Sequence, residues 1–117
     1  MILLVDDQAD VRFMLSLFLQ DEGMDFDEAA SGEEALEKLA TNHYDLVLLD
    51  QRMPPGISGI EVAERVRTIG TSTPIVLYSA FLDPQVEQKA ADLGLRTVDK
   101  GEPDRLIEAI RSTLAPQ

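Results

Sequence analysis

The sequence predicts an α/β domain in which a doubly wound parallel sheet of five strands is covered on both faces by five helices. Short apolar runs alternate with amphipathic segments along all 117 residues, so we expect one domain, residues 1–117. Three runs are apolar throughout, as strands buried on both faces are, and two are interrupted by polar residues. The interrupted strands belong at the edges, which favours the order 2-1-3-4-5 over 3-2-1-4-5.

Each strand is expected in a run of four or five residues, which is too short for a helix. These runs are ILLV (2–5), FDEAA (26–30), LVLL (46–49), IVLY (75–78) and LRTV (95–98). Turn and capping residues such as Gly23 and Pro74 bound them.

Each helix is expected where apolar residues recur at three- and four-residue spacing. The expected helices are residues 10–22, a segment opened by Ser31, residues 59–69, residues 84–93, and a segment from Pro103 to Leu114. Ser31 and Glu34 have the spacing of a capping box. The inward face of the first helix is expected to contain Val11, Met14, Leu15 and Phe18.

Polar side chains follow four of the five strands at the point where each strand ends. They are Asp6 and Asp7 after the first strand, Asp50 after the third, Ser79 after the fourth and Lys100 after the fifth. The carboxyl ends of parallel strands share one edge of a sheet, and the first and third strands flank the crevice where ligands bind in this architecture. We therefore expect these side chains to converge there.

The residue types at this edge favour magnesium and phosphate chemistry. Clustered carboxylates repel one another, and a hard cation with oxygen ligands, Mg²⁺, relieves the repulsion. A lysine and a hydroxyl can bind phosphoryl oxygens, and an aspartate can attack phosphorus to form an acyl phosphate. Taken singly, each residue has an ordinary explanation as a helix-terminal acid, a turn residue or a surface charge. Their coincidence at four strand ends favours a site.

The segments VDD (5–7), LLDQRMPPG (48–56), YSA (78–80) and DK (99–100) resemble the receiver domain of two-component response regulators, a flavodoxin-like fold, over the whole chain. The resemblance implies Asp50 as the phosphoacceptor and Mg²⁺ as the cofactor. It implies Asp7, Asp50 and the main-chain carbonyl of Arg52 as direct metal ligands, with Asp6 acting largely through water. It implies Ser79 and Lys100 as phosphate-stabilising residues, with Ser79 and position 97 as the switch.

Three departures from the family pattern bear on switching. Thr97 stands where the family usually has Tyr or Phe, Gly101 follows the lysine where the family usually has proline, and one extra residue precedes Ser58. Without the aromatic ring at position 97, the usual readout on the fourth helix, fifth strand and fifth helix is not assured. We also expect Arg52 and Phe81 to flank the phosphoryl entrance and to tune the lifetime of the acyl phosphate.

Composition limits the partners. The net charge of −12 disfavours direct contact with nucleic acid, and most of this acidity serves solubility. The chain has no cysteine, no apolar stretch long enough to span a membrane and no signal peptide, so we expect a cytoplasmic protein. The resemblance implies a histidine kinase or histidine phosphotransfer protein as phosphodonor and a downstream protein target. We expect a monomer or weak dimer, not a turnover enzyme.

Three alternative functions remain open. A degenerate receiver that binds proteins without phosphorylation is compatible with Thr97 and Gly101, although the retained acids and lysine weigh against it. An aspartyl-phosphate phosphatase requires a second acid two residues after the nucleophile, where this chain has Arg52. A flavin- or nucleotide-binding module requires a glycine- or hydroxyl-rich loop after the first strand, where this chain is acidic.

Overall fold

The computed structural model describes residues 1–80 and 82–114, which contain five strands alternating with five helices. The strands are β1 (Ile2–Val5), β2 (Phe26–Ala29), β3 (Leu46–Asp50), β4 (Ile75–Ser79) and β5 (Arg96–Asp99). The helices are α1 (Ala9–Asp21), α2 (Gly32–Thr41), α3 (Gly59–Thr68), α4 (Pro84–Asp92) and α5 (Pro103–Leu114). The predicted fold class is confirmed.

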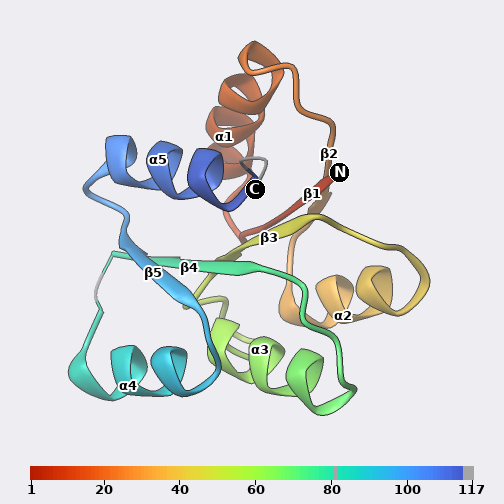
Figure 1. The fold of residues 1–117 in the computed structure, drawn as a ribbon, viewed down its shortest axis with the longest axis vertical. Helices are drawn as coiled ribbons and strands as arrows, with labels where there is room; N and C mark the ends of the chain where they lie inside the picture. Colours follow the sequence, from red (N-terminus) through yellow and green to blue (C-terminus); the bar gives the residue numbers. More distant parts are fainter. Residues whose placement is uncertain (81, 115–117) are drawn as a thin grey trace.

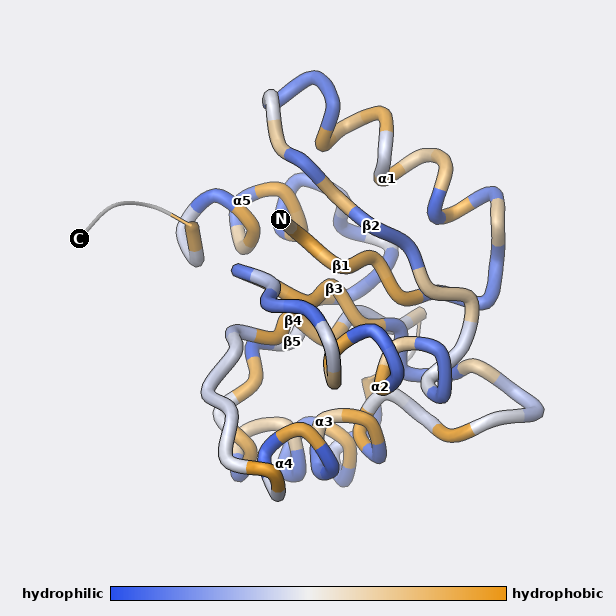
Figure 2. Tube along the Cα trace, turned by 90° about the vertical axis from the view of Figure 1, so that its right-hand side faces the viewer, coloured by the Kyte–Doolittle hydropathy of each residue, from blue (hydrophilic) through white to orange (hydrophobic). Residues whose placement is uncertain are grey.

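The sheet is entirely parallel and has the predicted order β2-β1-β3-β4-β5. Helices α1 and α5 cover one face, while α2, α3 and α4 cover the other (Figure 1). The three central strands are the apolar ones, and they form the hydrophobic centre of the molecule (Figure 2). The connections after β1 and after β3 therefore lead to opposite faces, which opens a crevice at the carboxyl ends of these neighbouring strands.

Side chains alternate between the two faces along each strand, and this divides the core into two layers. The layer under α1 and α5 contains Ile2 and Leu4 of β1, Leu46 and Leu48 of β3, and Tyr78 of β4. The other layer contains the residues between them, such as Val5, Leu49 and Leu77. This alternation also decides on which face of the sheet the side chain at the end of each strand lies.

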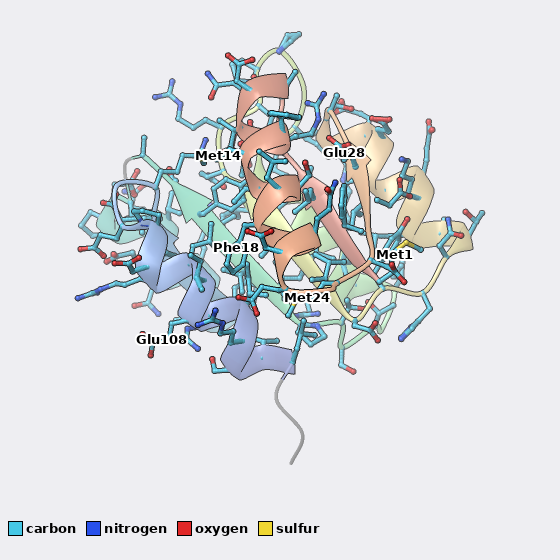
Figure 3. The ribbon with its side chains drawn as sticks, turned by 90° about the horizontal axis from the view of Figure 1, so that it is seen from above. Met1, Met14, Phe18, Met24, Glu28 and Glu108 are labelled. Carbon is cyan, nitrogen blue, oxygen red and sulfur yellow. The ribbon has the colours of Figure 1, made fainter. Side chains whose placement is uncertain are left out.

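The prediction that Met14 packs inward was wrong. The buried residues of α1 are Leu15, Ser16 and Leu19, whereas the Met14 side chain is 57% exposed. Met14 and Phe18 lie on the flank of α1 that faces α5 (Figure 3), at a groove between the two helices. Helices α1 and α5 lie side by side without closing this groove, so Met14 stays exposed beside it. Only a narrow stripe of α1 packs on the sheet.

Other local differences from the expected elements are small. Helices α1, α3 and α4 and every strand except β1 differ from their expected bounds by one residue at one or both ends. The Ser31 hydroxyl accepts a bond from Glu34 N, but the Glu34 carboxylate accepts from Ala30 N, so the predicted capping box is only half formed. A complete capping box joins Ser58 and Glu61 at the start of α3.

None of the helices in residues 1–80 and 82–114 combines the length and the apolar composition needed to cross a membrane.

Candidate functional site

The carboxyl ends of β1 and β3 bring three carboxylates together. Asp6 and Asp7 follow β1 directly, and Asp50 is the last residue of β3, the neighbouring strand. One oxygen from each of the three lies within 4.8 Å of the others. Asp6 is fully buried and Asp50 is 2% exposed, whereas Asp7 is exposed. The predicted convergence is therefore present, with two acids enclosed and one open to solvent.

Lys100 completes the cluster from the end of β5, an edge strand of the sheet. Its ammonium Nζ lies 3.1 Å from Asp50 Oδ1 and 3.4 Å from Asp6 Oδ2. Its main-chain N–H donates to the Ser79 carbonyl at 2.8 Å, which anchors the end of β5 to the end of β4. Asp6, Asp50 and Lys100 lie on the face of the sheet that α1 and α5 cover. Each follows a residue of that face, Leu4, Leu48 or Val98, by two positions.

Burial and charge raise the pKa of Asp50 to about 6 from an ordinary value of 3.8. Desolvation is the largest cause and the negative charge of Asp6 is the second. Lys100 and the main-chain N–H of Arg52 act in the opposite direction but do not outweigh them. The ionised cluster is thus under electrostatic strain, which a bound cation would relieve.

Asp6 is held by several contacts that strand-end reasoning missed. Gln8 N donates to its Oδ1 at 2.9 Å, and the Tyr78 hydroxyl donates to its Oδ2 at 3.0 Å. Arg12 Nη1 donates to its main-chain carbonyl at 2.6 Å and also pairs with Glu28. Burial, with the charges of Asp6 and Asp50, raises the pKa of Tyr78 well above its usual value, so the hydroxyl remains a donor.

Strand alternation offers a partial signal for Tyr78. It is the register partner of Asp50 on the next strand, and paired residues of neighbouring strands share a face. Once this register is known, strand alternation places its ring on the same side of the sheet as Asp50. Arg12 has no comparable signal, because its reach depends on how α1 lies against β1 and β2.

The remaining predicted residues are distributed around this cluster. Ser79 is buried at the end of β4, and Arg52 is exposed in the loop directly after β3. Thr97 is partly buried in β5 and lines a surface hollow with Glu87 and Arg105, between α4, β5 and α5. Phe81, which was expected to flank the entrance, lies outside the described residues.

The donor set fits a hard divalent cation. Asp6, Asp7 and Asp50 offer only carboxylate oxygens, and the chain has no cysteine to favour a softer metal. Within the described residues, no other group of three or more metal-ligating side chains was found. A buried carboxylate, an adjacent ammonium and a cation-binding set of oxygens together can support nucleophilic attack on a phosphoryl group.

Comparisons with known proteins agree with this geometry. The family model of the response regulator receiver domain matches residues 2–111. The sporulation initiation phosphotransferase F of Bacillus subtilis is 34% identical over 96 residues, which are 82% of this chain and 77% of that protein. The transcriptional regulatory protein ResD of Bacillus subtilis is 44% identical over 79 residues, 68% of this chain but only 32% of ResD. The chain thus spans about a third of ResD and less than half of the regulator DltR of Streptococcus agalactiae.

Among solved structures, the response regulator TrrA of Thermotoga maritima, in complex with Mg²⁺ and beryllofluoride, has a TM-score of 0.85 and 38% identity, and the match covers 97% of each chain. The chemotaxis protein CheY4 of Vibrio cholerae has a TM-score of 0.86 and 31% identity, with 97% of each chain covered.

Proposed function

This chain belongs to the response regulator receiver domain family, whose members are phosphorylated on an aspartate with Mg²⁺, and from this premise we propose that Asp50 is its phosphoacceptor. The observation that carries the proposal is the enclosed pair Asp6 and Asp50 with Lys100 between them. Asp50 is the acid that Lys100 contacts most closely, and it ends a central strand where the crevice opens.

The proposed reaction is the transfer of a phosphoryl group from a phosphohistidine of a partner protein. A carboxylate oxygen of Asp50 attacks phosphorus, the phosphorus–nitrogen bond breaks, and an acyl phosphate forms on Asp50. The imidazole leaves with the electron pair of that bond and takes a proton from solvent. No oxidation or reduction occurs, and the acyl phosphate is later hydrolysed on the same chain, so we propose a signalling domain without an external substrate.

The neighbouring residues would prepare this transfer. Asp7, Asp50 and the Arg52 carbonyl would hold Mg²⁺ directly, with Asp6 acting largely through water. The bound ion would supply positive charge that offsets both the carboxylates and the incoming phosphoryl oxygens. Lys100 can turn from the carboxylates toward a phosphoryl oxygen, and the Ser79 hydroxyl can donate to another.

Phosphorylation would act on a partner protein through a surface beside the site. Ser79 and Thr97 would couple phosphorylation to the surface formed by α4, β5 and α5. Thr97 cannot supply an aromatic ring, so the readout would depend on the polar hollow that it shares with Glu87 and Arg105. A histidine kinase or phosphotransfer protein would be the donor, and an unidentified protein the target. The expected cytoplasmic location and monomeric or weakly dimeric state stay predictions.

Intact mass spectrometry tests the proposal. The wild-type chain is incubated with Mg²⁺ and a small acyl or phosphoramidate phosphodonor, and it should gain the mass of one phosphoryl group. The Asp50→Asn variant should gain none, and chelation of Mg²⁺ should prevent the gain in the wild type. Asp99→Asn is the matched control, because Asp99 is exposed one residue before Lys100 and should leave the gain intact. A wild-type chain that gains no mass would favour the phosphorylation-independent alternative.

A further inference from the structure

A buried tyrosine lies directly beneath the acidic cluster. Tyr78 pairs in register with Asp50, and its side chain is 1% exposed in the core layer under α1 and α5. Its hydroxyl lies 3.0 Å from Asp6 Oδ2 and 3.3 Å from the Val5 carbonyl. The rigid core, rather than solvent, thereby sets the direction of one Asp6 oxygen.

The same ring also faces the lysine of the site. Lys100 Nζ lies 5.2 Å from the centroid of the Tyr78 ring, within the range of a cation–π interaction. That ammonium is the one that contacts both Asp6 and Asp50. Tyr78 therefore contacts the Asp6 carboxylate through its hydroxyl and the Lys100 ammonium through its ring, and it reaches both groups from the buried core.

We propose that Tyr78 is a positioning residue that orients the Asp6 carboxylate for Mg²⁺ binding, an inference that rests on the proposed function. The fully buried Asp6 has both oxygens engaged: Gln8 N binds Oδ1, while Tyr78 and Lys100 bind Oδ2. Loss of the hydroxyl leaves Lys100 as the remaining contact of Asp6 Oδ2. Partners that orient metal-binding carboxylates typically change metal affinity by about 10- to 100-fold.

The Tyr78→Phe variant isolates the hydroxyl, because phenylalanine keeps the ring in the core and over Lys100. The chain also offers a matched control in Tyr44, which precedes β3 at the opposite end of the sheet. Tyr44 is likewise 1% exposed, and its hydroxyl donates to Asp27 at 2.9 Å. Tyr44→Phe therefore removes the same chemical group, from a similar bond to an aspartate, away from the site.

Titration calorimetry with Mg²⁺ alone compares the wild type with Tyr78→Phe and Tyr44→Phe. We expect Tyr78→Phe to weaken Mg²⁺ binding about 10-fold and Tyr44→Phe to leave it within about twofold of the wild type. Phosphorylation by a small donor should show a raised Mg²⁺ requirement in Tyr78→Phe, with the rate at saturating Mg²⁺ near that of the wild type. A general loss of packing would instead lower both the Mg²⁺ affinity and the phosphorylation rate at saturating Mg²⁺.

Tyrosine absorbance gives a second readout of the same contact. The chain contains two tyrosines and no tryptophan, so its near-ultraviolet spectrum reports mainly on Tyr44 and Tyr78. Mg²⁺ should produce a tyrosine difference spectrum in the wild type and in Tyr44→Phe, but not in Tyr78→Phe.

The outcomes separate a failure of this inference from a failure of the proposed function. Unchanged Mg²⁺ affinity in Tyr78→Phe, an equal loss in both variants, or a wild type that binds Mg²⁺ without a tyrosine signal would overturn this inference and leave the proposed function standing. A wild type that binds no Mg²⁺ would overturn both.

Discussion

Replacing Asp50 by asparagine should stabilise the metal-free protein at neutral pH, even though it removes the contact with Lys100. The pKa of Asp50 rises from 3.8 to about 6 because burial and the charge of Asp6 outweigh Lys100. A pKa change of one corresponds to about 1.4 kcal/mol, so this rise would equal about 3 kcal/mol at full strength. The site opens to solvent at the exposed Asp7, so solvent screening reduces this value, and we expect a gain of about 1–2 kcal/mol in the free energy of unfolding.

The pH dependence of this gain has a definite sign. The folded chain binds a proton at Asp50 more tightly than the unfolded chain does, because the folded pKa is the higher one. This contribution to stability is complete below about pH 4 and is lost as the pH rises through about 6. The advantage of Asp50→Asn over the wild type should therefore be largest near pH 8 and small near pH 4.

Urea unfolding followed by circular dichroism, with a chelator present, measures the difference. Asp27→Asn is a control of opposite sign. Burial raises the pKa of Asp27, but hydrogen bonds from Lys38, Tyr44 and the Glu28 main chain outweigh burial and lower it. This variant should be less stable than the wild type at neutral pH. An Asp50→Asn chain that is no more stable than the wild type near pH 8 without metal would refute the electrostatic account of the cluster.

Two further substitutions test the packing and the charge balance of the site. In Gly59→Ala, the added Cβ would lie 2.5 Å from the Asp50 carbonyl oxygen and 2.7 Å from Leu77 Cδ1, so α3 must move away from β3. We expect a loss of about 1–3 kcal/mol in urea unfolding together with slower phosphorylation, and an unperturbed variant would contradict this close approach. Lys100→Gln leaves Asp6 and Asp50 facing each other without their ammonium, and it should lower metal-free stability by about 2 kcal/mol. Adding Asp50→Asn to Lys100→Gln should recover most of that loss, and strictly additive effects in this double-mutant cycle would argue against coupling.

Much of the site followed from local patterns. Strands buried on both faces need continuous apolar runs, so the runs at 2–5, 46–49 and 75–78 had to be central. Once the strands are parallel and adjacent, Asp6 and Asp50 must meet at one edge, whatever the details of packing. The register that pairs Tyr78 with Asp50, and the hydrogen bond from its hydroxyl to Asp6, come only from the tertiary structure.

The fold class, the strand order and the carboxylate cluster at the sheet edge could be predicted from the sequence, because they depend on hydrophobic periodicity and chain direction. Tertiary structure alone decided that Met14 is exposed beside a groove, that Arg12 reaches the Asp6 carbonyl, and that Asp6 is more deeply enclosed than Asp7. These features depend on the orientation of each helix about its own axis and on the distance between α1 and α5. Many weak contacts set those quantities together, and no short stretch of sequence encodes them.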